Sequence, residues 1–263
     1  MRDDWKKRID RAMQAIEEGE SILISGGAGL SSAAGMQSDG AAFAERFAPF
    51  IEKYGLTDLF ASVHYPFGTL EERWAYLAAF IGYVRDEAGP AELYKDLFRL
   101  VKHKAYFVIT TNADGQFEKA GFPAGRLFEI AGNYGRLQCA IGCHGELYLN
   151  ERLVKAMIAK TVDCAIPADM VPQCPVCGGE TAPNVTSSRY FVRDEKWYEA
   201  EAAYKAFVLD SVGKMRVFME LGVEHSPSIR LTIDHAARPG NHEVVTIDFA
   251  EPIRQVLPLF QQT

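Results

Sequence analysis

The chain lacks several features that would assign it to common protein classes. It contains no uninterrupted stretch of about 18 apolar residues, and its first residues, MRDDWKKRIDRAMQAIEEGE, lack the apolar core of a secretory signal. Lysine and arginine never gather in a strong run, and the net charge is -7 at pH 7. Nucleic acid is disfavoured as a main partner, because neutralising phosphates requires a basic face. We expect a soluble cytoplasmic protein with no membrane partner.

Cysteine is scarce, and its low number argues against a disulfide framework. Only five cysteines occur among 263 residues, and Cys164 is the odd one. Such usage fits a reducing compartment in which thiols bind metal. With 48% hydrophobic and 24% charged residues, the chain is long enough for one large core, or for one core carrying a small extra module.

Hydrophobic patterning predicts an α/β fold with a parallel sheet. Apolar residues at helical spacing predict an amphipathic helix at 3–18, and an aromatic-rich stretch predicts a helical insertion at about 41–100. Short apolar runs rich in β-branched residues are typical of buried parallel strands. We predict such strands at 21–25, 105–110, 127–130, 215–220 and 243–248.

Four cysteines have the spacing of a structural zinc site. Cys139 and Cys143 form a C-x3-C pair, and after a gap of thirty residues Cys174 and Cys177 form a C-x2-C pair with Pro175 inside it. Two disulfides, or thiols buried as small apolar groups, are the alternatives. Four thiolates would complete the coordination of Zn2+ and leave no position for substrate, so chemistry is expected elsewhere.

The cysteine pairs interrupt the α/β pattern, which resumes after them. We therefore predict a Rossmann-like domain made of residues 1–136 and 186–263, with the helical insertion inside it. The zinc-binding module is predicted at 137–185.

Two polar turns follow the first two predicted strands, at the end where α/β folds bind ligands. In the first, the small residues Gly27, Ala28 and Gly29 would let backbone N–H groups approach a pyrophosphate. A turn that serves packing alone is the alternative. In the second, Asn112 and Asp114 are suited to a ribose hydroxyl and a carboxamide, and a capping Asx turn is the alternative. The GxGxxG order and a clear acidic ribose ligand are missing, which disfavours an ordinary dehydrogenase.

Taken in order, GAGLSSAAG, TTNADGQFEKAG, CxxxC and CPxCGG resemble the sirtuin family over nearly the whole chain. The resemblance implies a Rossmann-like NAD-binding domain with an inserted zinc domain, and NAD consumed between the two. It implies that Asn112 faces the nicotinamide ribose, that Asp114 holds the carboxamide, and that two later residues lie by the adenosine. The implied cofactor-binding residues are Gly27, Ala28, Gly29, Ser31, Asn112, Asp114, Gly222 and Asp248.

The chain departs from the deacylases of that family at several positions. Their Ile-Pro-Asp-Phe-Arg segment is replaced by 36–40, MQSDG, and Thr111 stands where they have Gln. Ala131 occupies the position of their general-base histidine, and a methyl group takes no proton. The Phe-Gly-Glu segment that pairs with an acyl-lysine peptide is absent after Val185. Phe43 and Phe47 are candidates to replace the missing aromatic, but their four-residue spacing also fits a core.

These departures resemble the macrodomain-linked sirtuins of microbes. That resemblance implies an NAD-dependent protein mono-ADP-ribosyltransferase acting on a lipoylated carrier related to the glycine cleavage H protein, with a macrodomain and a lipoate ligase as partners. The subclass has Gln where the deacylases have His, so Ala131 departs from both and predicts reduced activity. A lysine deacylase and a non-catalytic NAD- or ADP-ribose-binding module remain as alternatives. His144 is expected as a surface group or as a group that contacts a zinc ligand.

Overall fold

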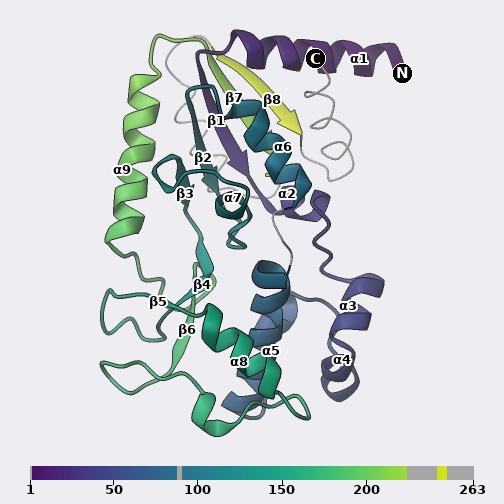
Figure 1. Ribbon diagram of the computed structural model, residues 1–263, viewed down its shortest axis with the longest axis vertical. Coiled ribbons are helices and arrows are strands. Elements are labelled where there is room, and N and C mark those ends of the chain that lie inside the picture. The colour runs from purple at the N-terminus through teal and green to yellow at the C-terminus, as the bar shows by residue number, and fades with distance from the viewer. Residues whose placement is uncertain (1, 88–90, 224–241, 248–263) are drawn as a thin grey trace. The chain divides into compact units, whose positions relative to one another are not determined.

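A computed structural model describes residues 2–87, 91–223 and 242–247 (Figure 1). The chain forms two compact units, each built from segments that are distant in sequence. The first unit comprises Met1–Gly35, Pro90–Gly132 and Glu195–Thr263, and the second comprises Met36–Gly89 and Asn133–Asp194.

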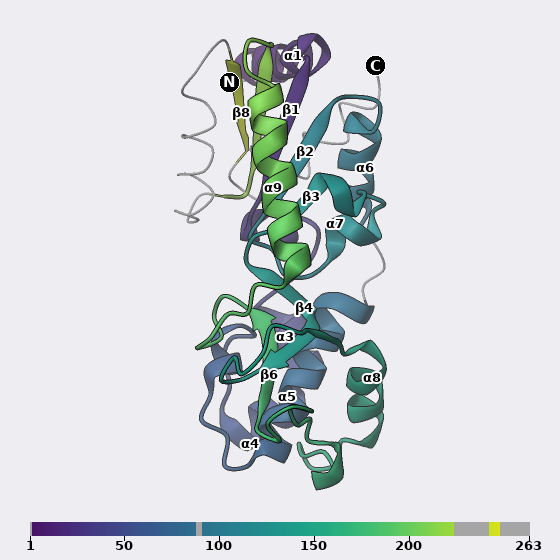
Figure 2. The same cartoon turned by 90° about the vertical axis from the view of Figure 1, so that its left-hand side faces the viewer.

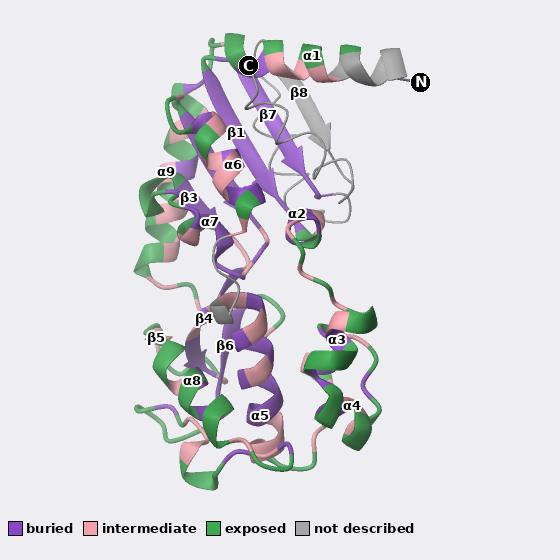
Figure 3. Ribbon diagram, turned by 45° about the vertical axis from the view of Figure 1, so that its right-hand side comes forward, coloured by how far each residue is buried: buried purple, intermediate pink, exposed green. Residues whose placement is uncertain are grey.

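The first unit contains a five-stranded sheet within the described residues, with strand order β3-β2-β1-β7-β8. All four strand pairs are parallel, which confirms the predicted fold class and the five predicted strands. Strands β1, β2 and β7 are buried along their length, as expected of apolar runs covered on both faces (Figure 3). The strands are β1 (Ser21–Gly26), β2 (Tyr106–Thr110), β3 (Leu127–Glu129), β7 (Arg216–Leu221) and β8 (His242–Ile247).

Both faces of this sheet are packed because successive strand residues point to opposite sides. Ile22 and Ile24 lie in one apolar core with Leu97, whereas Leu23 lies in another with Tyr204. Helix α9 lies against β2 and β3 on the second face (Figure 2). No helix of the described residues is both long and apolar enough to cross a membrane. The helices of this unit are α1 (Arg2–Glu18), α2 (Ala28–Ala33), α6 (Glu92–Val101), α7 (Gln116–Lys119), η3 (Ala124–Arg126) and α9 (Glu195–Asp210).

The second unit combines a three-stranded sheet, ordered β5-β4-β6, with a core rich in aromatic side chains. Phe43 and Phe47 belong to this core, stacked at 5.3 Å between ring centroids, and both are almost fully buried. Their spacing therefore reflects packing. Its strands are β4 (Gly132–Cys139), β5 (Tyr148–Leu149) and β6 (Thr181–Val185). Its helices are α3 (Gly40–Arg46), α4 (Ala48–Tyr54), η1 (Ala61–His64), α5 (Leu70–Ile81), η2 (Gly82–Glu87), α8 (Glu151–Lys160) and η4 (Ala168–Met170).

The predicted helical insertion at 41–100 is divided between the two units. Helices α3, α4 and α5 belong to the unit that contains the four predicted metal ligands, whereas α6 packs in the core of the parallel sheet. The domain limits drawn from the sequence, with a zinc-binding module at 137–185 inserted in a domain of 1–136 and 186–263, stay a prediction.

Candidate functional site

Two glycines let the turn after β1 and the turn after β7 meet backbone to backbone. A Cβ on Gly27 would lie 2.3 Å from the carbonyl oxygen of Gly222. A Cβ on Gly222, whose φ is +63°, would lie 2.3 Å from the amide nitrogen of Leu30. The amide of Gly29 donates to the Gly222 carbonyl at 3.1 Å. Packing therefore requires glycine at 27 and 222, and Ala28 is the exposed first residue of α2.

The end of β2 is tied to the end of β1 by side-chain hydrogen bonds. The hydroxyl of Thr110 donates to the carbonyl of Gly26 at 2.8 Å and accepts the amide of Asn112 at 3.0 Å. The Asn112 carboxamide nitrogen donates to the carbonyl of Gly27 at 2.9 Å. These bonds hold Asn112 against the glycine turn at the carboxyl edge of the sheet.

Asp114 lies at the same edge, almost fully buried at 5% exposure. Its Oδ2 accepts the Ser31 hydroxyl at 2.7 Å, and its Oδ1 accepts the amide of Gln116 at 3.0 Å. The second contact is the Asx turn that the sequence left open as an alternative, and the first adds a link to α2. Burial raises the pKa of Asp114, although both hydrogen bonds oppose that shift.

Tyr94 joins this cluster, although the sequence analysis did not single it out. Its hydroxyl lies 3.1 Å from Ser31 Oγ and accepts from Asn112 Nδ2 at 3.2 Å. Burial, and then the charge of Asp114, raises the pKa of Tyr94 well above its ordinary value. The signal was a tyrosine on the apolar stripe of α6, because a buried tyrosine hydroxyl requires a partner.

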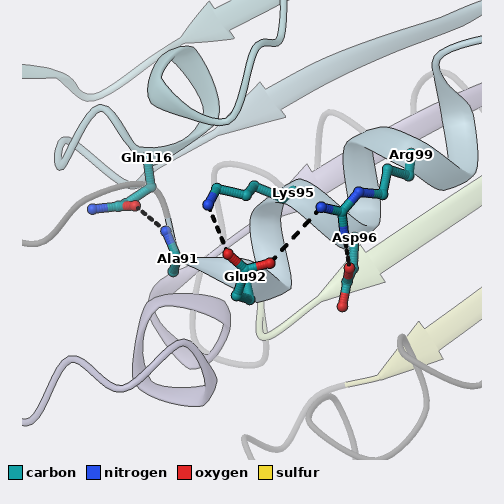
Figure 4. A network of polar contacts seen from close by, with 6 residues as sticks. All are labelled: Ala91, Glu92, Lys95, Asp96, Arg99 and Gln116. Atoms are coloured by element: carbon teal, nitrogen blue, oxygen red, sulfur yellow. Dashed lines mark hydrogen bonds and ion pairs between the residues drawn. The ribbon is translucent and has the colours of Figure 1, made fainter.

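Helix α6, which carries Tyr94, is fixed at its first turn. The Gln116 side chain accepts the amide of Ala91, the residue that caps the helix, at 3.1 Å (Figure 4). Gln116 also donates its own amide to Asp114, so one residue links the start of α6 to the polar cluster. On the exposed side, Glu92 pairs with Lys95 at 2.6 Å, a contact expected to add little stability.

Ala131 lies in the turn between β3 and β4 and is partly exposed. The preceding residue, Ile130, donates its amide to the carbonyl of Thr110 at 3.0 Å, and its carbonyl accepts the indole N–H of Trp197 at 3.3 Å. Position 131 thus directly follows a residue anchored at the end of β2, and it offers only a methyl group. Asp248 lies outside the described residues. The structure brings Gly27, Ser31, Asn112, Asp114 and Gly222 into one contact network, and their roles toward NAD stay predictions.

The four predicted metal ligands of the second unit meet in one cluster. Among the described residues, the sulfurs of Cys139, Cys143, Cys174 and Cys177 lie within 4.8 Å of one another. Two sulfur pairs are 3.7 Å and 3.6 Å apart, close to the edge of about 3.8 Å expected when zinc binds four thiolates at about 2.3 Å. These distances are far longer than a disulfide bond, and all four are free thiols. The donor set therefore fits a closed zinc site.

Backbone amides at the cysteine turns favour the thiolate form. The amide of Cys177, with that of Val176 and the ring of His144, lowers the pKa of Cys174 to about 6. The amide of Cys143 likewise lowers the pKa of Cys139, whereas desolvation and the adjacent thiols raise that of Cys143.

His144 contacts a cysteine of this cluster. Its Nδ1 accepts the amide of Glu146 at 3.1 Å, so Nε2 carries the proton and faces the sulfur of Cys174 at 3.2 Å. His144 is thus placed to donate to a metal ligand, one of the two roles expected for it.

Comparison with known proteins agrees with this fold. No protein-family model matches the chain. A protein ADP-ribosyltransferase of Staphylococcus aureus (strain Mu50 / ATCC 700699) is 32% identical over 227 residues, which cover 85% of this chain and 71% of that protein. A probable bifunctional ADP-ribose hydrolase/ADP-ribosyltransferase of Fusarium oxysporum f. sp. cubense is 28% identical over 82% of this chain, which spans only 37% of that longer protein. NAD-dependent protein deacylase 2 of Pseudomonas aeruginosa is 30% identical over 69% of this chain and 66% of its own length.

Solved structures show the same fold at low sequence identity. A Sir2 homologue in complex with NAD matches 96% of this chain and 94% of its own, with a TM-score of 0.61 and 14% identity. A structure from work on the mechanism and regulation of Sir2 enzymes matches 98% of this chain and 99% of its own, with a TM-score of 0.58 and 15% identity. Together with the Staphylococcus relative, this likeness shows that the chain belongs to the sirtuin family of NAD-dependent enzymes.

Proposed function

We propose that the protein is a sirtuin-type mono-ADP-ribosyltransferase that moves ADP-ribose from NAD to a protein acceptor. The observation that carries this proposal is the 32% identity to a protein ADP-ribosyltransferase over 85% of the chain. The buried cluster of Ser31, Asn112 and Asp114 supports it, because its polar groups gather where parallel sheets bind nucleotides.

In this proposal the carboxyl edge of the parallel sheet holds NAD. Asp114 accepts hydrogen bonds from the nicotinamide carboxamide, because each of its oxygens accepts one protein donor and keeps a second lone pair. Asn112 faces the nicotinamide ribose. The pyrophosphate lies by Gly27, Ala28, Gly29 and Ser31, and the adenosine by Gly222 and Asp248.

Chemistry begins with cleavage of the bond between the nicotinamide nitrogen and the ribose. Nicotinamide leaves with the bonding electrons, and the ribose passes through an oxocarbenium-like state that the acceptor attacks while losing a proton. Positioning and electrostatics drive the first step, so it requires no strong base at the sugar. Ala131 cannot take the acceptor's proton, and the loss of a general base is commonly worth about 10² to 10⁴-fold. We therefore expect this chain to turn over slowly.

The zinc ion has a structural role in this proposal. Four thiolates complete its coordination, so bound zinc holds the cysteine turns together and touches neither NAD nor the acceptor. The free thiols also suit a reducing compartment, for which we propose the cytoplasm.

The proposed acceptor is a lipoylated carrier protein related to the glycine cleavage H protein. A macrodomain hydrolase and a lipoate ligase are proposed to act beside it. The Fusarium relative supports the hydrolase, since its name joins an ADP-ribose hydrolase to an ADP-ribosyltransferase.

The direct test incubates the protein with labelled NAD and the carrier, lipoylated or bare. Label is expected on the lipoylated carrier only, slowly with the protein as it stands and faster with Ala131→Gln, whose amide can bind the acceptor's nucleophile. Ala131→Leu is the control for bulk without polarity, and it should bring no gain. If neither the unaltered protein nor Ala131→Gln labels any carrier, the assignment is refuted.

Lysine deacylation is the second candidate, and the Pseudomonas deacylase at 30% identity favours it. The methyl group of Ala131 opposes it, because deacylation in the family depends on a histidine at that position. Release of acetate from an acetyl-lysine peptide, with NAD present, would establish deacylation. Tight NAD binding in calorimetry with no nicotinamide release would instead support a non-catalytic nucleotide-binding module.

A further inference from the structure

We propose that Tyr94 is a positioning residue that, together with the Gly27 carbonyl, holds Asn112 so that its carboxamide oxygen is presented to the ligand. The inference rests on the proposed function for its consequence, but the geometry that carries it lies wholly within the first unit. Four side chains, from Asn112 through Tyr94 and Ser31 to Asp114, form one chain of hydrogen bonds.

The direction of every bond in this chain is set by its two ends. Asp114 accepts the only proton of the Ser31 hydroxyl at 2.7 Å. Ser31 has no second proton, so in the 3.1 Å contact with Tyr94 it accepts and the tyrosine donates. The Tyr94 oxygen then accepts from Asn112 Nδ2 at 3.2 Å. In each hydrogen bond of this chain, the donor is thus the residue nearer to Asn112 and the acceptor is the residue nearer to Asp114.

The orientation of the Asn112 carboxamide follows from the same logic. A backbone carbonyl only accepts, so the atom of Asn112 that lies 2.9 Å from the Gly27 oxygen is the nitrogen. Its two protons are both used, one by Gly27 and one by Tyr94. No donor to Asn112 Oδ1 is recorded in the part of the chain that the structure describes. Asn112, 8% exposed, therefore presents an acceptor, which suits a hydroxyl donor such as that of a ribose.

Tyr94 is itself rigidly held, as a positioning residue must be. Its side chain is 0% exposed, and its ring packs edge-on against Phe117 with 4.9 Å between centroids. The start of α6 is tied to Gln116 (Figure 4). The amide of Gln116 in turn donates to Asp114, so the hydrogen-bond network closes on itself. The Tyr94 hydroxyl is therefore held in one place. Its removal should be felt first as a change in the position of the Asn112 carboxamide.

The test variant is Tyr94→Phe, which keeps the ring packing and removes only the hydroxyl. Its matched control is Tyr76→Phe in the second unit. That tyrosine is also 0% exposed, and its hydroxyl donates one hydrogen bond, to the Leu59 carbonyl at 2.6 Å. Each variant loses buried hydrogen bonding of similar kind, so each melting temperature should fall by roughly 2 to 4 °C.

The first measurement needs no ligand and follows the side-chain amide protons of Asn112 by NMR. In Tyr94→Phe one of the two protons should shift and exchange faster with solvent, whereas Tyr76→Phe should leave both unchanged. Amide signals that are the same in Tyr94→Phe and in the unaltered protein would overturn the proposal.

The second measurement is nicotinamide release from NAD. Misplacing a group beside the reacting atoms costs up to about 10²-fold, so kcat in Tyr94→Phe should fall about tenfold to hundredfold while KM stays within about threefold. Tyr76→Phe should leave both constants unchanged. An unchanged kcat in Tyr94→Phe would show that the hydroxyl does not matter for the reaction and would also overturn the proposal.

A double-mutant cycle separates positioning from a structural role. If Tyr94 acts through Asn112, Tyr94→Phe should lower kcat no further once Asn112→Ala is present. If Tyr94→Phe lowers kcat equally with and without Asn112→Ala, Tyr94 does not act through Asn112. If the unaltered protein releases no nicotinamide, the proposed function fails, and the amide signals still decide whether Tyr94 orients Asn112.

Discussion

The polar cluster of the first unit and the cysteine cluster of the second are assembled in opposite ways. Two cysteines come from each of two short turns, so most of that cluster is determined by spacings of two or three residues. The polar cluster joins groups that are distant in sequence: Ser31 meets Tyr94 across 63 positions and Asp114 across 83. The polar cluster therefore depends on the parallel sheet being formed, whereas the four clustered thiols would be held together by a bound zinc ion.

The two clusters should therefore fail in different ways when altered. Bound zinc would join the two cysteine pairs, so the loss of a ligand should be felt as a loss of folding. The polar cluster is embedded in a packed core, so a change of one atom should reduce chemistry and leave folding largely intact.

Replacement of a zinc ligand should give the largest effect. Cys174→Ser removes a buried thiolate whose pKa is lowered to about 6 by neighbouring amides, and a serine hydroxyl is a poor substitute. We expect loss of bound zinc and a fall in the free energy of unfolding of several kcal/mol, about the range that follows from removing structural metals. Zinc content and thermal unfolding, with and without a chelator, measure both.

Cys164→Ala is the matched control, because that thiol is also buried but lies in the apolar core of the second unit. It should keep its zinc and lose only about 1 kcal/mol of stability, as expected for a small buried side chain. Full zinc content and unchanged melting in Cys174→Ser would show that the cysteine cluster does not hold the second unit together.

The same contrast explains what could be predicted from sequence. The cysteine ligands and the five strands follow local rules of spacing and apolar runs, so they were found. Tyr94 was missed because on its own helix it is one more residue of an apolar stripe, and only tertiary contacts give its hydroxyl a role. The stretch at 41–100 is mostly helical in its sequence pattern, with breaks near 65–68 and 89–90, and the pattern does not tell that α6 packs against the parallel sheet while α5 belongs to the aromatic core.

Asp114→Asn should separate chemistry from stability. The amide keeps the shape but loses the charge that holds the nicotinamide carboxamide, and removal of one such preorganised group commonly costs about 10² to 10³-fold in kcat. Nicotinamide release should fall by that factor, while thermal unfolding at pH 7 should change only slightly, because removal of the buried charge offsets the loss of one of the two accepted hydrogen bonds. A variant that releases nicotinamide normally would remove Asp114 from the proposed site.

The raised pKa of Asp114 also predicts how the stability of Asp114→Asn, relative to the unaltered protein, changes with pH. Burial raises the pKa of Asp114 above its ordinary value of 3.8, so the folded state keeps the proton to a higher pH than the unfolded state. The stabilisation that arises from this raised pKa is fully present below pH 3.8 and is lost as the pH rises through the pKa of the folded state. The Asp114→Asn variant has no such loss, because a carboxamide does not titrate in this range. Urea unfolding from pH 4 to pH 7 should therefore show the variant gaining on the unaltered protein as pH rises, and a difference that shrinks would contradict the assigned shift.

A last pair of variants tests the backbone contact beneath the polar cluster. In Gly222→Ala the added Cβ would lie 2.3 Å from the amide nitrogen of Leu30, at a φ of +63°, so both the contact and the backbone conformation oppose it. Gly55→Ala is the control, because its φ of +67° nearly equals that of Gly222 but no atom lies within 4 Å of the added Cβ. Strained backbone alone costs about 1 to 3 kcal/mol, so the excess loss of stability in Gly222→Ala over Gly55→Ala, measured by urea unfolding, isolates the close approach of the two turns. Equal losses of stability in the two variants would mean that the turns after β1 and β7 separate at little cost in free energy. The packing beneath the polar cluster would then contribute little to holding that cluster together.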